Sequence, residues 1–319
     1  MHRIPITDYR ILFTDYKYDT MKHTVTLLTI FLTGSLAFSQ QMPLSENYFM
    51  DRYSLSPSYA GNHSVQYLYS GYRSDWTGIA GGPRTIRLSY NDRLMQNAGL
   101  GGRILYDKAG IFSQLYLMGS YSYRLQFVES HYLLFGMSAG LYRNGIDLSE
   151  YYNSPGFELD PALTGNDIRS RIKFMSDFSM VYCWEELEAG VLFTNITFGE
   201  ANYGEVETRY KPLANFQVHA AWKYDFDETW SISPLVIVRS GKYIKSNFEI
   251  ATQVGYTERF RGSVVFRDPG IFGFGAGIDI DRGLKLGYNF NFATNVQLKA
   301  FNSHEVTLGV NIFEYIGPR

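Results

Sequence analysis

The residues best suited to chemistry are few and lie far apart in the chain. His304 and Glu305 are adjacent, and His219 lies on an alternating polar face, but neither histidine has a second histidine or a carboxylate at metal-ligand spacing. Cys183 is the only cysteine, so it cannot form an internal disulfide, and we expect it to fill space as a small buried residue. We therefore expect no metal, no cofactor, no catalytic residue and no enzyme activity.

Two glycine-rich runs could suggest a phosphate-binding loop. They are Gly99-Leu100-Gly101-Gly102 and Gly273-Phe274-Gly275-Ala276-Gly277. Neither fits the G-x-G-x-x-G pattern between a strand and a helix, which nucleotide binding requires. Glycine alternating with apolar residues instead indicates a crowded or closely approached face of a strand.

The sequence around these residues alternates between apolar and polar side chains with a period of two. From residue 284, apolar Leu284, Leu286, Tyr288, Phe290 and Phe292 alternate with Lys285, Gly287, Asn289 and Asn291, and Val306 to Ile312 continue the pattern against Glu305 to Asn311. Such alternation predicts β-strands with one face in an apolar medium and the other in a polar or crowded one. The chain is also rich in aromatic residues (17%), which suits an extensive sheet.

The same pattern recurs in fourteen stretches, each about as long as a tilted strand that crosses a bilayer, roughly 9 to 11 residues. A sheet edge in lipid would leave backbone groups unpaired, so the sheet must close. The sequence therefore predicts an all-β, transmembrane antiparallel β-barrel of about 14 strands. The predicted strands are 64–73, 84–91, 98–106, 112–125, 131–144, 174–184, 186–196, 213–224, 230–240, 245–256, 258–267, 271–280, 284–293 and 303–313.

The lengths of the gaps between these strands support the prediction. The longest gaps, 74–83, 145–173, 197–212 and 294–302, all have odd numbers when counted from the first strand. Outer-membrane barrels have short periplasmic turns and longer external loops, so the long gaps are expected outside the cell. With an even number of strands, both termini are then expected in the periplasm.

The ends of the chain are not expected to form barrel strands. An apolar run from Thr24 to Phe38 follows Met21-Lys22-His23, which predicts a signal peptide over 21–39 and a start-site over-extension over 1–20. Residues 40–63 have no clean period. Their aromatics could plug the barrel or dock on a periplasmic partner, and a poorly ordered terminus is the third alternative. The barrel is expected over 64–313, followed by a tail over 314–319.

Several short motifs occur in a recognisable order. They are Ser56-Pro57-Ser58-Tyr59-Ala60-Gly61, Tyr72-Arg73, Trp76-Thr77-Gly78, Gly81-Gly82-Pro83-Arg84-Thr85, Gly99-Leu100-Gly101, Asp107-Lys108-Ala109-Gly110, Gly287-Tyr288 and Ser303-His304-Glu305-Val306-Thr307-Leu308-Gly309. In this order the chain resembles the PorP/SprF family of type IX secretion system membrane proteins. The family has Asn-Pro-Ala where this chain has Ser56-Pro57-Ser58.

The resemblance implies a non-enzymatic outer-membrane protein that supports secretion or surface attachment of an adhesin-like partner and, in gliding species, motility. The implied partners are membrane lipid, a secreted protein with a C-terminal sorting domain and other type IX secretion components. Near-neutral charge (formal net charge −2) gives no case for nucleic acid. The motif residues with expected structural or partner-contact roles are Pro57, Tyr59, Ala60, Gly61, Trp76, Gly78, Pro83, Asp107, Lys108, Gly110, Ser303, His304 and Glu305.

Two other functions fit a barrel of this size. A passive channel or transporter for a small apolar or amphiphilic solute would use the polar inner face, where the alternation places Arg87, Arg103, Glu249, Arg261 and Lys285. An outer-membrane enzyme would need a catalytic constellation, and the sequence offers none. The external loop 145–173 is the expected contact surface for a secreted partner.

Overall fold

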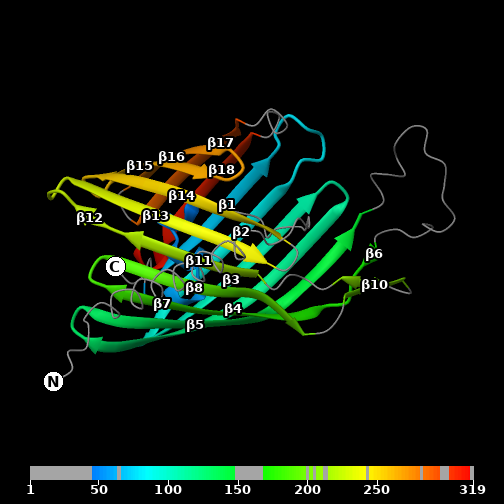
Figure 1. The fold of residues 1–319 in the computed structure, drawn as a ribbon, viewed down its shortest axis with the longest axis horizontal. Helices are drawn as coiled ribbons and strands as arrows, with labels where there is room; N and C mark the ends of the chain where they lie inside the picture. The colour runs from blue at the N-terminus through cyan, green and yellow to red at the C-terminus, as the bar shows by residue number, and fades with distance from the viewer. Residues whose placement is uncertain are drawn as a thin grey trace, which may run out of the picture. The chain divides into compact units, whose positions relative to one another are not determined.

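Fourteen long strands pair side by side into one closed antiparallel ring (Figure 1). The computed structural model describes residues 45–62, 66–147, 168–198, 201–203, 206–210, 215–241, 244–280, 283–294 and 302–316. The expected start-site extension and signal peptide lie outside these residues, as does most of loop 145–173. The ring strands are β1 (Tyr67–Asp75), β2 (Arg84–Met95), β3 (Ala98–Ala109), β4 (Phe112–Val128), β5 (His131–Ile146), β7 (Lys173–Trp184), β8 (Leu187–Phe198), β11 (Asn215–Trp222), β13 (Trp230–Gly241), β14 (Ile244–Tyr256), β15 (Phe260–Arg267), β16 (Ile271–Ile280), β17 (Leu284–Ala293) and β18 (Ser303–Asn311).

The ring closes where the first strand meets the last. Strand β1 pairs with β18 in a continuous register from Tyr67↔Asn311 to Asp75↔Ser303. Every other neighbour in the ring is also the neighbour in the chain, so each connection is a hairpin. Closure leaves the ring without an unpaired edge, as the membrane requires.

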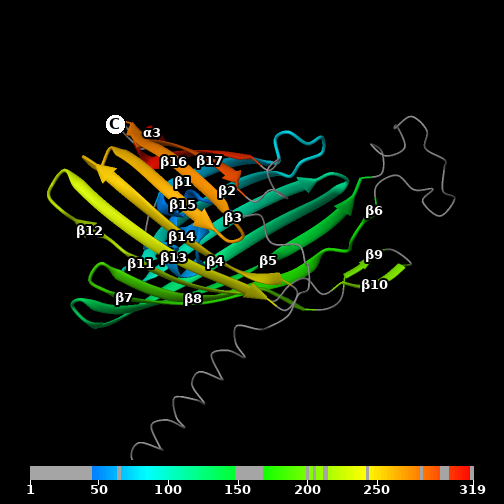
Figure 2. The same cartoon turned by 45° about the horizontal axis from the view of Figure 1, so that its top comes forward.

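Four short strands lie outside the ring. Strand β6 (Ile168–Arg169) pairs with the end of β5, and β12 (Tyr224–Asp225) pairs with the start of β13. Strands β9 (Ala201–Tyr203) and β10 (Val206–Tyr210) form a separate hairpin within the connection from β8 to β11, as Figure 2 shows.

The connections sort by length between the two ends of the barrel. At one end, here called the turn end, every connection is short: 96–97, 129–130, 185–186, 226–229, 257–259 and 281–283. The other end, here called the loop end, carries all the long connections, namely those from β1 to β2, β5 to β7, β8 to β11 and β17 to β18. This is the sorting that the gap lengths predict. Residues with positive φ close several tight turns, among them Glu185 (φ 52°) and Thr257 (φ 53°).

The predicted two-faced strands are confirmed. On β17 the side chains of Leu286 and Tyr288 are exposed on the outer face, whereas Asn289 and Asn291 are buried on the inner face. Strand β18 repeats this, with Val306 outside and Glu305 inside. The boundary differs at the end of the chain. The strand stops at Asn311, and Ile312 opens the short helix α3 (Ile312–Ile316) instead of extending the row of lipid-facing residues.

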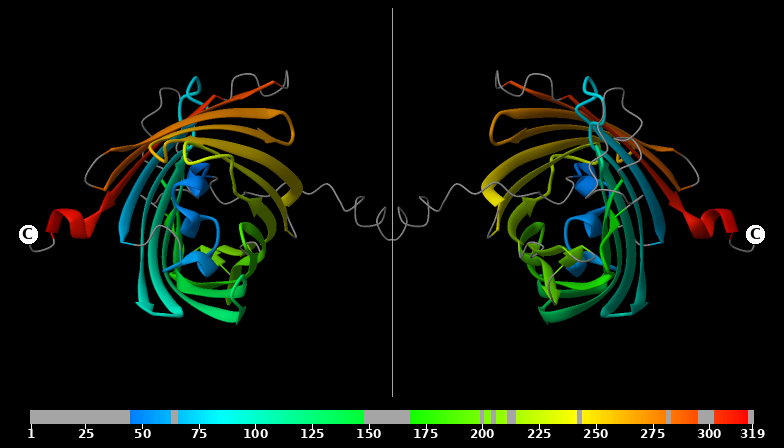
Figure 3. Two further views of the ribbon diagram at one scale, coloured as in Figure 1. Left: turned by 90° about the vertical axis from the view of Figure 1, so that its left-hand side faces the viewer. Right: turned by 90° about the vertical axis from the view of Figure 1, so that its right-hand side faces the viewer.

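The interior of the barrel holds the segment 45–62, here called the plug. Figure 3 looks along the barrel and shows this segment, in blue, inside the ring of strands. It forms three single-turn 3-10 helices: η1 (Asn47–Phe49), η2 (Arg52–Ser54) and η3 (Pro57–Tyr59). Helix η3 starts with Pro57 at its first position, and the Ser56 side chain accepts a hydrogen bond from the Ser58 N–H. No helix among the described residues is long and apolar enough to cross a bilayer.

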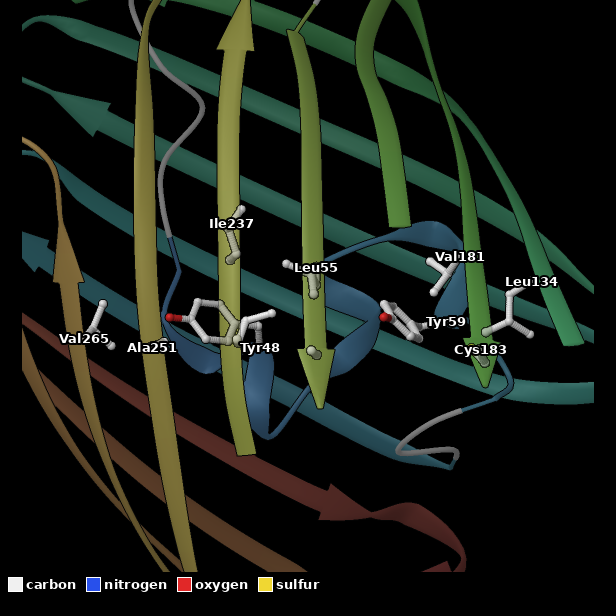
Figure 4. Packing of buried hydrophobic residues seen from close by; sticks show 11 residues of the cluster. Tyr48, Leu55, Tyr59, Leu134, Val181, Cys183, Ile237, Ala251 and Val265 are labelled. Atoms are coloured by element: carbon white, nitrogen blue, oxygen red, sulfur yellow. The ribbon is translucent and has the colours of Figure 1, made fainter. Parts of the chain in front are cut away.

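An apolar core forms between the plug and one side of the wall. Tyr48, Leu55 and Tyr59 of the plug pack against inward side chains of neighbouring strands (Figure 4). Those wall residues are Leu134, Val181, Cys183, Ala221, Leu235, Ile237, Ala251 and Val265. Cys183 is fully buried there, which confirms its predicted role as a small space-filling residue.

Inward glycines make room for the plug. A Cβ added to Gly101 would lie 2.6 Å from the ring of Tyr53, and one added to Gly99 would overlap the Ala60 carbonyl. The interpretation of these glycines as a closely approached inner face is therefore confirmed at β3.

Gly136 on β5 offers a direct test of this fit. A Cβ there would overlap the backbone nitrogen of Ser58 and lie 2.5 Å from the carbonyl carbon of Pro57. We expect Gly136→Ala to lower the free energy of unfolding by about 1–3 kcal/mol, because backbone on both sides must shift. Urea unfolding in detergent micelles, followed by tryptophan fluorescence, measures this.

Gly119→Ala on the neighbouring strand β4 is the matched control, because no atom lies within 4 Å of its added Cβ. We expect it to change the free energy of unfolding by less than about 0.5 kcal/mol. Equal effects of the two substitutions would show that the plug does not press against β5.

Candidate functional site

Glu305 of β18 is the anchor for the start of the plug. Its carboxylate accepts hydrogen bonds from Ser45 Oγ (2.8 Å), the Glu46 backbone N–H (3.0 Å) and Asn47 Nδ2 (2.8 Å). The same carboxylate pairs with Arg73 Nη1 at 3.2 Å and Arg87 Nη1 at 2.9 Å. One acidic side chain thus joins three consecutive plug residues to the two arginines on β1 and β2.

Glu46 places a second carboxylate in the interior. Its Oε1 atom lies 2.8 Å from Arg267 Nη2, 2.6 Å from Asn291 Nδ2 and 3.6 Å from Arg73 Nη1. The plug therefore carries a charge that the wall binds from β1, β15 and β17 at once.

Glu249 of β14 completes the network from the wall. It pairs with Arg239 Nη1 (2.9 Å) and Arg267 Nε (2.6 Å) and accepts a hydrogen bond from the Tyr48 hydroxyl (2.6 Å). Burial, reinforced by the charge of Glu249, raises the pKa of Tyr48 well above its ordinary value, so the hydroxyl stays a donor.

We call this set the ionic network; it contains Glu46, Glu249, Glu305, Arg73, Arg87, Arg239 and Arg267. The three carboxylates are almost completely buried, with side chains at most 1% exposed. Removing one partner from such a pair leaves an uncompensated buried charge, which costs about 3–5 kcal/mol. The network therefore fixes the position of the plug strongly, even though its net contribution to stability is small.

The far end of the plug is held by neutral groups and one carboxylate. The Tyr59 hydroxyl donates to Glu188 Oε2 (2.8 Å) and lies 3.0 Å from His219 Nε2. Burial, with the charge of Glu188, raises the pKa of Tyr59 well above its ordinary value. Ser58 binds Ser179 through both its backbone N–H (3.0 Å) and its hydroxyl.

Position 61, next to the last residue of the plug, requires glycine. Gly61 has φ +68°, its N–H donates to Asn91 Oδ1 at 2.9 Å, and an added Cβ would lie 2.5 Å from Gly99 Cα. Both the left-handed backbone and the close approach exclude a side chain here.

Asp51 lies between these two ends. Its Oδ2 atom accepts a hydrogen bond from Ser89 Oγ at 2.5 Å, and the residue is 3% exposed. Burial raises the pKa of Asp51 to about 6, although the hydrogen bond from Ser89 opposes the rise. Its contribution to stability is thus largest when it is protonated and is lost as the pH rises through 6.

The motif residues do not meet in one site. Pro57, Tyr59, Ala60 and Gly61 belong to the plug, and Ala60 accepts a hydrogen bond from Ser122. In the last strand, Ser303 and Glu305 point inward, whereas His304 is on the outer face beside Tyr288, with 2.7 Å between its Nδ1 and the tyrosine hydroxyl.

The remaining motif residues gather at the loop end. Trp76, 41% exposed, and Gly78 lie in the β1–β2 loop, which the hydrogen bond from the Asp75 N–H to the Pro83 carbonyl closes (2.8 Å). Gly110 has φ +57°, and its N–H donates to the Gly81 carbonyl. Asp107 accepts from Thr85 Oγ1, and Lys108 lies 3.3 Å from Asp147. The Gly110–Gly81 hydrogen bond holds the β1–β2 loop against the β3–β4 turn.

Sequence reasoning missed the partners of Glu305. Arg73 appears in a motif and Glu46 in an aromatic run, but nothing in either stretch predicts that the two charges meet. Glu46 itself could have indicated the contact, because a charged residue inside an aromatic segment that enters a barrel needs an opposite charge on the wall. The inward position predicted for Arg87, Arg103, Glu249, Arg261 and Lys285 is confirmed by their ion pairs or burial.

The contacts described above hold the plug in place inside the wall. No cluster of three metal-ligating side chains occurs in the described part of the chain. Every charged group of the ionic network has an oppositely charged partner within the network. The geometry defines a class: a membrane β-barrel that holds its own segment 45–62 in the interior.

The chain belongs to the family described as type IX secretion system membrane protein PorP/SprF, whose model matches residues 37–310. It is thus an outer-membrane β-barrel of that family. A comparison with curated proteins gives no match.

Several solved structures are similar to the chain at low sequence identity. Omp33, an outer membrane protein of Acinetobacter baumannii, has 8% identity and a TM-score of 0.46, covering 76% of this chain and 96% of its own. A FadL homologue of Pseudomonas aeruginosa has 10% identity and a TM-score of 0.49, with 86% and 99% covered. The CymD monoaromatic hydrocarbon channel has 11% identity and a TM-score of 0.49, with 84% and 92% covered.

Glu305→Gln tests the ionic network. The substitution keeps the shape and some hydrogen bonds but leaves Arg73 and Arg87 without their shared charge, so we expect a loss of about 3–5 kcal/mol of unfolding free energy. We also expect the plug to become sensitive to added protease, measured by mass spectrometry of the released peptides.

His304→Gln is the matched control one residue earlier. It changes only contacts on the outer face, to Tyr288 and Phe290, so we expect a change of no more than about 1 kcal/mol and an intact plug. A Glu305 variant as stable and protease-resistant as this control would contradict the anchoring role.

Proposed function

We propose that this protein is a non-enzymatic outer-membrane component of type IX secretion that supports secretion or surface attachment of an adhesin-like partner with a C-terminal sorting domain. The match to the PorP/SprF family over residues 37–310 carries this proposal. A role in gliding motility would follow where the attached partner is a motility adhesin.

The packing of the interior favours a holding role over a transport role. The plug makes polar contacts with β1, β2, β4, β7, β8, β11, β14, β15, β17 and β18, and it touches β3 and β5 closely at Gly99 and Gly136. A segment held from so many directions obstructs the interior and braces the wall. A rigid, obstructed barrel suits a protein that presents a fixed outer surface to a partner.

The proposed contact surface is the loop end, which we assign to the cell exterior. The β1–β2 loop there is tightly folded, and the adjacent long connections offer the area that a partner would need. We assign both termini to the periplasm, because the even-numbered ring puts the start of β1 and the end of β18 at the turn end. Loop 145–173, the expected main contact, lies mostly outside the described residues.

Deletion of the gene tests the proposed function. We expect cells to lose one or a few large sorting-domain proteins from their surface, while other secreted sorting-domain proteins remain. Quantitative mass spectrometry of surface-labelled cells measures this, and the wild-type gene should restore the lost proteins. A complementing variant lacking residues 150–168 should insert in the outer membrane but fail to restore display. An unchanged surface proteome in the deletion strain would contradict the proposal.

The alternative function, a passive channel, makes the opposite prediction for conductance. Because the plug obstructs the interior, we expect the wild-type protein in planar lipid bilayers to show no steady conductance. A variant without residues 45–61 should conduct if it folds, and its heat-modifiable mobility on gels checks that folding. A stable open conductance of the wild-type protein would favour the channel.

A further inference from the structure

A cavity of about 190 Å³ lies inside the barrel on the loop-end side of the plug. Its floor is formed by plug residues, including Asn47, Asp51 and Leu55. Its walls come from the strand segments nearest the loop end, such as the end of β13 at Arg239 and the start of β11 at Asn215. Two members of the ionic network, Arg87 and Arg239, line this space, which the proposed function does not use.

The apolar part of the wall is broad. It includes Tyr69 of β1, Tyr116 and Met118 of β4 and Leu192 of β8. A concave site of this kind, with a few placed polar groups, is typical of small-molecule binding sites.

Most of the charged side chains that line the cavity are positive. Among the described residues that line the cavity, the charged ones are Arg87, Arg103, Arg239 and Asp51. The three arginine side chains are 16–19% exposed, whereas the acids that pair with them, Glu305, Asp177 and Glu249, are at most 1% exposed. The acids therefore lie behind the arginines, and the guanidinium groups face the space.

These guanidinium groups have donors beyond those used for their acids. Arg103 binds Asp177 through Nη2, and Arg239 uses Nε for Gln217 and Nη1 for Glu249. A guanidinium has five N–H donors, so Arg103 and Arg239 can each serve a further acceptor on the cavity side. Asp51 is the single acidic side chain among the described lining residues, so the three arginines outnumber it.

We propose that this cavity binds a small amphiphilic carboxylate, with the acid group against Arg87, Arg103 and Arg239 and a short acyl chain along the aromatic and aliphatic wall. Planar guanidinium groups match the geometry of a carboxylate. The size of the cavity suits a short chain, not a whole lipid. The proposal goes beyond the secretion role and does not depend on it, since a barrel that holds a protein partner can also bind an acyl ligand in its interior.

Binding of octanoate to the full-length protein in lipid nanodiscs tests the proposal. Isothermal titration at neutral pH, with empty nanodiscs as the reference, should show saturable binding of octanoate. Octyltrimethylammonium has the same chain and the opposite charge, and it should bind at least tenfold more weakly. Absence of saturable octanoate binding, or equal affinity for the two ions, would overturn the proposal.

Two variants locate the site. Arg103→Gln combined with Asp177→Asn removes a cation together with its buried acid, so the wall keeps its charge balance, and octanoate affinity should fall at least tenfold. Leu192→Trp fills the cavity and should do the same without changing any charge. Arg124→Gln is the control, because Arg124 stacks on Tyr132 near the turn end and does not line the cavity. Unchanged octanoate affinity in both cavity variants, or an equal loss in the control, would place any bound octanoate elsewhere.

Discussion

A buried charge needs a partner, and this constraint decides how the plug and the wall fit together. Glu46 enters the barrel on the plug and is at most 1% exposed at its side chain, so it must meet Arg267 and Arg73. Glu305, which lies on β18, also pairs with Arg73 and accepts a hydrogen bond from the plug backbone. Because Arg73 lies on β1 and Glu305 on β18, the pairing also joins the two strands that close the ring. The same ion pairs thus fix the position of the plug and join the two strands that close the ring.

The shapes of the plug and the wall also fit each other. The wall opposite the plug carries glycine where the plug backbone approaches most closely, at Gly99 and Gly136, and the plug itself has glycine at residue 61. Serines and asparagines elsewhere on the inner face, such as Ser179 and Asn291, satisfy backbone and carboxylate groups of the plug. Some of the residues shared with the PorP/SprF motifs belong to this fit: residues 57–61 form the far end of the plug, and Glu305 anchors its start.

The barrel could be predicted from the sequence because its signal is local. Alternation at residues 284–292 and 306–310 reports a strand with two different environments, and each of the fourteen predicted strands overlaps an observed one. The plug could not be placed in this way. Residues 45–62 have no period, and their contacts depend on charges and small residues more than a hundred positions away, such as Glu249 and Glu305. The end of β18 was also missed, because Ile312 keeps the apolar alternation although the backbone has already turned into α3.

The central claim is that the plug occupies the interior of the barrel in the membrane. It is tested most directly by cross-linking Ser58 to Ser179, whose hydroxyl oxygens lie 2.5 Å apart. A variant with Ser58→Cys and Ser179→Cys, in a Cys183→Ala background, should form a disulfide in isolated outer membranes, because the two side chains are already in bonding range. Mass spectrometry of tryptic peptides under non-reducing conditions should recover the linked pair. Free thiols at both positions, labelled by a membrane-impermeant maleimide, would contradict the account.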